Sequence, residues 1–397
     1  MMTVRTKYSR SMITGILMSI LLFSSMLFAG KITPAAEQLN RYLPLLKNKH
    51  VALVVNHSSL TAQGHLVDTL LKHGIKVKKI FAPEHGFRGK SDAGAHVKSS
   101  HDRKTGLPII SLYGKHKKPT RRDLKGIDLI LFDIQDVGVR FYTYLSTLHY
   151  IMEAGAEQQI PVIVLDRPNP NAHYIDGPVL QKKYRSFVGL HPVPIVYGMT
   201  IGEYAGMING ERWLKGRKQV KLTVIPIANY THKSIYSLPV KPSPNLPNDR
   251  SIVLYPSLAF FEGTVISAGR GTTKPFQLYG DPKYQIQKFS FTPKSRPGAK
   301  YPKFKGKRCY GVDLSRTDLK KERAKQYIDL SYLQDAYTHY PDKKHFFLKN
   351  RFIDRLAGSD KLRKQIGSGM SAENIRKSWK KDLEKFKKIR SKYLLYP

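Results

Sequence analysis

The chain has 397 residues and a formal net charge of +39, and 41% of its residues are hydrophobic. This length leaves room for two domains, and this hydrophobic content can fill sizeable cores, so disorder is not expected. The positive charge favours an anionic partner such as nucleic acid, lipid head groups or an anionic cell-wall polymer. Cys309 is the only cysteine, which excludes a disulfide within the chain and disfavours a cysteine–histidine zinc site.

Residues 1–30 are predicted to be a signal peptide. Arg5, Lys7 and Arg10 precede an apolar run over 12–28, and small residues at 29 and 30 suit a cleavage site. A retained membrane anchor is the alternative, because the run is slightly long for a signal and slightly short for a span. We therefore expect a periplasmic or secreted bacterial envelope protein, without stable membrane insertion once the signal is cleaved. Export and the lack of a recognition motif argue against nucleic acid as a partner.

Apolar runs alternate with amphipathic segments after the signal. The expected helices cover 33–49, a segment that begins at Thr61 and stops at Gly74, 142–159, and a segment that starts at Thr200. The expected strands cover 51–55, 75–81, 107–113, 127–132, 161–165 and 220–227. This alternation predicts an α/β fold, with a Rossmann-like, doubly wound and mostly parallel sheet over residues 45–255.

The texture of the sequence changes after a proline-rich connector at 241–248. Strands are expected near 289 and over 308–314, and helices from about 323 and over 373–393. We interpret residues 256–397 as a second, smaller α+β domain.

Polar side chains follow four of the expected strands, and ligands bind outside the carboxyl ends of the strands in such sheets. No G-x-G-x-x-G or P-loop motif is present, so no dinucleotide or other cofactor is expected. The residues at these strand ends are Asn56, His57, Glu84, His85, Asp133, Gln135, Asp136, Asp166, Arg167 and Asn169.

These motifs together resemble the exo-β-N-acetylmuramidases of the NamZ type. The resemblance is carried by the stretches 82–89, 105–108, 132–144, 165–170, 198–203, 243–247, 261–264 and 269–272. It implies a Rossmann-like N-terminal domain and a smaller C-terminal domain with the active cleft between them. It also implies release of terminal N-acetylmuramic acid from the non-reducing ends of peptidoglycan fragments, so the expected partners are muramyl saccharides.

Cleavage of a glycosidic bond needs an acid for the leaving oxygen and a second group that supplies or assists the nucleophile. Glu84 is the candidate acid, although it would also suit a hydrogen bond to a sugar hydroxyl. Candidates for the second group are Asp133, Asp136, Asp166 and Glu262. Asp136 is equally suited to an ion pair with Arg140, and the 2-acetamido group of the substrate could itself serve as the nucleophile.

Muramic acid carries a lactyl carboxylate, which suits an arginine fork. Arg88, Arg140, Arg167 and Arg270 are the candidates, and each is equally suited to a structural ion pair. Tyr142 is a candidate for lining the sugar pocket, with plain packing as the alternative. The other candidate substrate-binding residues are Asn56, His85, Gln135, Asn169 and Glu262.

No metal site is expected, because His57, His85, His96 and His101 with Asp92 match no standard ligand spacing. A non-catalytic wall-binding protein on the same scaffold is the main alternative function. A hydrolase of an ester or amide is disfavoured by the lack of a G-x-S-x-G motif.

Overall fold

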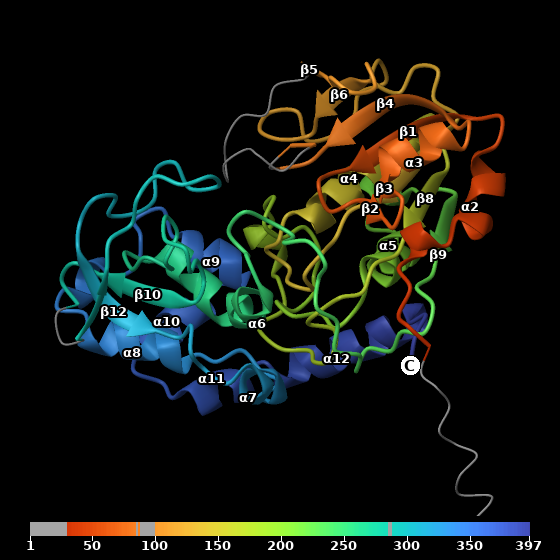
Figure 1. Ribbon diagram of the computed structural model, residues 1–397. Coiled ribbons are helices and arrows are strands. Elements are labelled where there is room, and N and C mark those ends of the chain that lie inside the picture. The colour runs from red at the N-terminus through yellow and green to blue at the C-terminus, as the bar shows by residue number, and fades with distance from the viewer. Residues whose placement is uncertain (1–29, 85, 88–99, 285–287) are drawn as a thin grey trace, which may run out of the picture.

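The computed structural model describes residues 30–84, 86–87, 100–284 and 288–397. We call residues 30–248 the first lobe and residues 249–397 the second lobe; Figure 1 shows them side by side. A seven-stranded sheet with the order β5-β6-β4-β1-β7-β8-β9 forms the centre of the first lobe. Its pairs are parallel except for β5 with β6. The strands are β1 (His50–Val55), β4 (Lys76–Ala82), β5 (Ser100–His101), β6 (Pro108–Ser111), β7 (Leu129–Asp133), β8 (Val162–Leu165) and β9 (Leu222–Ile225).

Strand β1 is buried on both faces, as its continuous apolar sequence predicts. The side chains from Val51 to Val55 are all 0% exposed. Ala52 and Val54 pack with helices α4 (Tyr144–Gln158) and α5 (Ile201–Gly210), whereas Leu53 and Val55 pack with α2 (Leu39–Leu46) and α3 (Leu66–Lys72). Helices on both faces of a mostly parallel sheet confirm the predicted doubly wound α/β class.

The local sequence predicted the start of one helix correctly and the start of another incorrectly. Thr200 begins α5 as predicted, in a capping box with Glu203. Thr61 does not cap a helix, because it lies in the short hairpin of β2 (Leu60–Thr61) and β3 (Gly64–His65), and His65 caps α3 instead. The segment predicted as one helix over 33–49 is divided into the 3₁₀ turn η1 (Ala35–Glu37) and α2.

The second lobe is an α+β unit around the antiparallel sheet β10-β12-β11. Helix α6 (Asp249–Leu258) runs through the domain boundary predicted at 255/256, so that position lies inside a continuous helix of the second lobe. The remaining strands are β10 (Leu278–Asp281), β11 (Phe289–Phe291) and β12 (Cys309–Asp313). The helices are α7 (Leu319–Ala324), α8 (Ser331–His339), α9 (Phe352–Ala357), α10 (Lys361–Gly367), α11 (Ala372–Lys377) and α12 (Lys380–Arg390). The 3₁₀ turns beyond η1 are η2 (Lys182–Tyr184), η3 (Lys215–Arg217), η4 (Ala259–Gly263), η5 (Lys343–His345) and η6 (Ser391–Tyr393).

One apolar core extends across both lobes. It includes Phe132 and Leu148 of the first lobe and continues without a break to Phe260, Leu333 and Phe346 of the second. The two lobes are therefore joined by buried apolar surface as well as by the chain.

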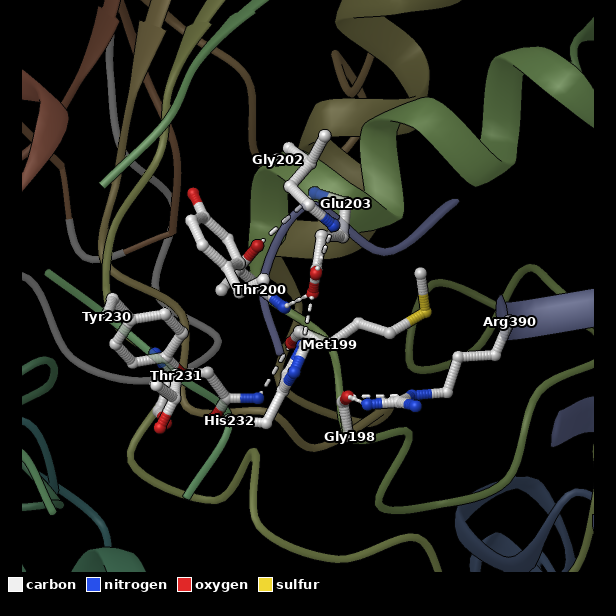
Figure 2. Close-up of polar contacts among 12 residues, drawn as sticks. Gly198, Met199, Thr200, Gly202, Glu203, Tyr230, Thr231, His232 and Arg390 are labelled. Carbon is white, nitrogen blue, oxygen red and sulfur yellow. Dashed lines mark hydrogen bonds and ion pairs between the residues drawn. The ribbon is translucent and has the colours of Figure 1, made fainter. Parts of the chain in front are cut away.

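The C-terminal segment returns to the first lobe. Helix α12 leads away from the second lobe toward the sheet (Figure 1). The guanidinium of Arg390 donates to the carbonyl oxygen of Gly198 at 2.8 and 2.5 Å, and His232 contacts the Glu203 carboxylate at 2.9 Å (Figure 2). The backbone N–H of Leu395 donates to the same Glu203 at 2.8 Å. The contacts of Arg390 and Leu395 therefore tie the C-terminal end of the second lobe to the first lobe, whereas the contact between His232 and Glu203 lies within the first lobe.

Among the helices of residues 30–84, 86–87, 100–284 and 288–397, none has the length and apolarity needed to cross a bilayer.

Candidate active site

A cavity of about 1010 Å³ lies between the two lobes. This volume is at the upper end of the range typical of small-molecule sites. Its first-lobe wall includes Glu84, Tyr113, Lys117, Phe141, Tyr142, Thr143, Tyr144 and Phe187. Its second-lobe wall includes Tyr255, Glu262, Arg270, Phe276, Lys300, Tyr301 and Pro302.

Glu84 stands in the cavity wall just beyond the end of β4. Pro83 ends the strand, and Gly86 follows with a φ of 74°, a conformation that glycine adopts without strain. The hydroxyl of Thr143 donates a hydrogen bond of 2.7 Å to the Glu84 carboxylate. Thr143 directly precedes α4 but makes no side-chain cap, so its hydroxyl serves the carboxylate instead of the helix.

The opposite wall presents an ion pair on the second lobe. Nε of Arg270 donates to Glu262 of turn η4 at 3.1 Å, and the guanidinium lies 5.0 Å from the ring centroid of Phe276. The two side chains are 24% and 27% exposed. Burial opposes the charge of Arg270, yet the field of Glu262, with smaller contributions from Tyr255 and Glu84, raises its pKa. Within the described residues, the two terminal nitrogens of this guanidinium make no hydrogen bond.

Aromatic rings connect the two walls. Tyr255 of the second lobe contacts Phe141 of the first lobe edge to face, with ring centroids 5.4 Å apart, and contacts Tyr142 in the same way at 6.2 Å. The Tyr142 hydroxyl donates to the carbonyl oxygen of Pro242 at 2.7 Å, which fixes its ring against the connector. The site therefore combines apolar surface with a few placed charges, as sugar recognition requires.

Asp133 and Arg167 form a buried pair away from this cavity. Nε and Nη2 of Arg167 donate to the two Asp133 oxygens at 2.5 and 2.8 Å, and the carboxylate is 0% exposed. Nη2 also donates to the carbonyl oxygen of Leu60 at 3.1 Å. Burial opposes the charge of Arg167, but Asp133 outweighs it and raises the arginine pKa. Neither side chain lines the cavity, so we propose no catalytic or binding role for them.

Hydrogen bonds among the protein's own residues fill the crevice between the ends of β1 and β7. The Ser59 hydroxyl donates to the carbonyl oxygen of Asp133, and the N–H of Gln135 donates to the Ser58 hydroxyl at 3.1 Å. The Asn56 carboxamide oxygen accepts from Ser58 at 2.6 Å, and the Gln135 amide donates to Pro168 at 2.7 Å. The structure therefore places Asn56 and Gln135 outside the cavity lining, although the sequence places them at the strand ends.

Asp166 and Asn169 are likewise buried. Asp166 accepts from the hydroxyls of Thr200 and Tyr396 at 2.7 and 2.6 Å, and burial raises its pKa to about 7 despite these bonds. The Asn169 amide donates to the carbonyl oxygen of Met199 at 2.7 Å. These contacts hold the loop after β8 to α5 and to the C-terminal segment, and they do not reach the cavity.

Asp136 and Arg140 do not pair, which corrects one of the expected alternatives. Asp136 accepts from the Tyr197 hydroxyl and the Gly138 N–H with one oxygen, and burial raises its pKa to about 6. Arg140 donates instead to three carbonyl oxygens, those of Pro178, Val193 and Leu356, at 2.8, 2.6 and 2.9 Å. Burial lowers the pKa of this arginine to about 9. Arg140 thus joins the lobes and does not line the cavity.

His85 and Arg88 lie outside the described residues, as do Asp92 and His96 of the histidine pattern considered for a metal site. No group of three or more histidine, cysteine or carboxylate side chains suited to a metal occurs in the part of the chain that the structure describes.

Sequence reasoning missed Thr143, Tyr255, Phe276 and the loop with Lys300 and Tyr301. Thr143 lies between two tyrosines that attracted attention, but nothing in its local sequence indicates a bond to a glutamate 59 positions earlier. Phe276 is the last residue of the glycine-rich segment that also contains Arg270. Its place next to a candidate binding residue was the one sequence feature that could have indicated a role in the site.

Comparison with known proteins gives the family. The family models of the N-terminal and C-terminal parts of exo-β-N-acetylmuramidase NamZ match residues 51–250 and 253–396. The chain is 43% identical over 373 residues to the peptidoglycan β-N-acetylmuramidase NamZ of Bacillus subtilis (strain 168), covering 89% of each.

Solved structures of two DUF1343 family proteins from Bacteroides fragilis NCTC 9343 share the fold. They align with TM-scores of 0.86 and 0.79 at 48% and 31% identity, and each alignment covers 92% of this chain and 99% of the other. The expected resemblance is thereby confirmed, and the chain belongs to the exo-β-N-acetylmuramidase NamZ family.

Proposed function

We propose that this protein is an exo-acting glycosidase that releases terminal β-N-acetylmuramic acid from the non-reducing end of peptidoglycan fragments. One observation carries the proposal: a single cavity presents Glu84 on one lobe and the Glu262–Arg270 pair on the other. An acid, a second carboxylate and a cation are the groups that hydrolysis of an anionic amino sugar needs.

Glu84 is the general acid in this proposal. It protonates the glycosidic oxygen as the bond to the anomeric carbon breaks, and the hydroxyl of Thr143 holds its other oxygen in place. Aromatic side chains line the cavity with it, so a bound sugar displaces water from the cavity and its electrostatic interactions with the site become stronger.

Arg270 is the arginine that receives the lactyl carboxylate. Arg140 and Arg167 donate to buried backbone or carboxylate oxygens, whereas Arg270 lines the cavity and bonds Glu262 through Nε. A carboxylate approaching the terminal nitrogens would form the forked contact that guanidinium groups favour.

Glu262 is the second carboxylate, because it lines the cavity while Asp133, Asp136 and Asp166 do not. It has two chemical uses, to activate water or to orient the substrate's acetamido group for attack. The anomeric configuration of the first product, measured by NMR, separates them: direct water attack inverts it, and acetamido participation retains it.

Hydrolysis of a chromogenic β-N-acetylmuraminide, with the matching β-N-acetylglucosaminide as comparison, tests the proposal. Turnover of the muraminide with little turnover of the glucosaminide is expected, because the glucosaminide lacks the carboxylate for Arg270. Binding of wall fragments without turnover of either glycoside would favour a non-catalytic wall-binding protein.

The same proposal places the protein outside the cytoplasm. The basic, apolar and small-residue succession over 1–30 supports export, and the cell-wall substrate class agrees with it. Fractionation of expressing cells, with mass spectrometry of the mature N-terminus, distinguishes a cleaved signal from a retained anchor.

A further inference from the structure

Tyr301 is unusual among the large apolar side chains that the structure describes. It is 79% exposed, more than any other such side chain within the described residues, and it lines the cavity at the same time. It belongs to the loop over residues 292–307, which we call the outer loop. Single exposed hydrophobic side chains are common on protein surfaces, so it is the position of this ring at the edge of a sugar-sized cavity that makes it a candidate ligand contact.

The outer loop is anchored firmly although Tyr301 is exposed. Two residues on, the Lys303 ammonium donates to the carbonyl oxygens of Phe261, Thr264 and Ile266 at 2.8, 2.7 and 3.2 Å, and burial lowers its pKa. The Asn245 amide of the first lobe donates to the carbonyl oxygen of Gly298 at 2.8 Å. The ring is therefore presented on a fixed backbone, which reduces the entropy cost of binding to it.

The surroundings of Tyr301 are cationic. The ammonium groups of Lys300 and Lys305 lie 5.6 and 5.7 Å from its ring centroid. The sequence contains no aspartate or glutamate between 292 and 312. Across the cavity, Lys117 lies 4.8 Å from the ring centroid of Phe187, another lining residue. The opening thus combines aromatic rings with lysines, whereas the interior contains the carboxylates Glu84 and Glu262.

We propose that Tyr301, Lys300 and Lys305 form a second saccharide subsite, which binds the part of the glycan beyond the bond that is cleaved. The C–H face of the first sugar after that bond packs on the Tyr301 ring. The next sugar is again a muramyl unit with a carboxylate, which the two lysines attract. This inference rests on the proposed function, and it predicts that the enzyme favours a tetrasaccharide over a disaccharide.

Kinetics with a MurNAc–GlcNAc disaccharide and the corresponding tetrasaccharide test the subsite. Tyr301→Ala is expected to lower kcat/KM for both by roughly tenfold, the factor for about 1.4 kcal/mol. Inhibition by free N-acetylmuramic acid, which occupies the inner pocket alone, should not change. Lys300→Ala with Lys305→Ala should reduce the preference for the tetrasaccharide, and 0.5 M NaCl should reduce it in the unaltered protein because salt screens exposed charges.

Matched controls exist on the same chain. Tyr327→Ala removes another exposed tyrosine, and Lys381→Ala with Lys385→Ala removes two exposed charges from α12; neither set lines the cavity. These variants should retain unaltered kinetics with both saccharides.

The outcomes separate the two proposals. Unchanged disaccharide kcat/KM in Tyr301→Ala, or an equal loss of inhibition by N-acetylmuramic acid, would overturn the subsite while leaving the muramidase function intact. If the unaltered protein turned over no muramyl saccharide, the proposed function would fall. Calorimetric binding of the tetrasaccharide to the unaltered protein and to Tyr301→Ala would then still decide the subsite, with equal affinities counting against it.

Discussion

Carboxylates lie at or just after the ends of three strands of the first lobe, and their surroundings differ sharply. Glu84, after β4, lines the cavity and accepts from the Thr143 hydroxyl. Asp133, the last residue of β7, and Asp166, directly after β8, are 0% exposed and are held by Arg167, Thr200 and Tyr396. The comparison teaches that the end of a parallel strand supplies polar groups, and that later parts of the chain decide which of them remain open to a ligand.

Glu84→Gln tests the carboxylate that lines the cavity, and it should have the largest effect. Glutamine keeps the shape of the side chain but cannot donate the carboxyl proton, so kcat should fall by roughly 10²–10⁴-fold with substrate binding retained. Steady-state kinetics with a chromogenic muraminide measure the loss, and Glu373→Gln on the exposed face of α11 is the control. Turnover within a few-fold of the unaltered protein would assign the acid elsewhere.

Arg167→Ala tests the structural role of the buried carboxylate Asp133. It leaves the Asp133 carboxylate buried without a counter-ion, which should lower the free energy of unfolding by about 3–5 kcal/mol. Urea denaturation followed by circular dichroism measures the change. Asp133→Leu with Arg167→Met should recover much of the stability because no charge stays buried. A loss of activity in protein that remains fully folded and stable would contradict the structural role.

Asp136→Asn tests how the buried carboxylate Asp136 makes the stability of the protein depend on pH. Burial raises the pKa of Asp136 to about 6 from an ordinary value near 4, so the folded protein holds this proton more tightly than the unfolded chain. Its contribution to stability is complete below about pH 4 and is lost as the pH rises through 6. Between pH 4 and 7 the unfolding free energy of the unaltered protein should therefore fall by on the order of 2–3 kcal/mol more than that of the variant. Asp382→Asn, on the exposed face of α12, should follow the unaltered protein, and parallel curves for Asp136→Asn would refute the prediction.

Tyr396→Phe gives the smallest expected effect. It removes the hydroxyl that donates to Asp166 at 2.6 Å and accepts from the N–H of Ile227 at 2.9 Å. We expect a loss of about 1.5 kcal/mol in the free energy of unfolding, measured by thermal or urea denaturation. Tyr393→Phe, which removes a less buried hydroxyl bonded to Glu211, should cost less, and equal losses would show that the burial of Asp166 is unimportant.

The sequence predicted the sheet well because strand burial is a local property of composition. The apolar runs at 51–55 and 161–165 became β1 and β8 within a residue at each end. Thr200 was recognisable because a capping box is complete within four residues. The prediction for Thr61 was wrong because its hydroxyl bonds Gly64 within a short hairpin and Thr69 of the following helix α3, and the helical sequence pattern gave no sign of this hairpin.

The site was less predictable. Whether a polar residue at a strand end lines the cavity or is buried in a structural contact depends on partners that are distant in the sequence. Asp166 meets a tyrosine 230 positions later, and Arg140 meets a carbonyl oxygen 216 positions later. No spacing rule anticipates either contact. Glu84 and Arg270 were nevertheless among the candidates, since each lies in a short glycine-containing turn with charged and apolar residues together.

The position of Arg140 also bears on how a ligand enters. Its guanidinium donates to Pro178 and Val193 on one lobe and to Leu356 on the other. Swinging the lobes apart would strip this buried cation of an oxygen on one side, which is costly. We therefore expect ligands to enter the cavity through a permanent opening, without movement of the lobes. Crystals of the unliganded protein should then tolerate soaking with muramyl sugars without cracking.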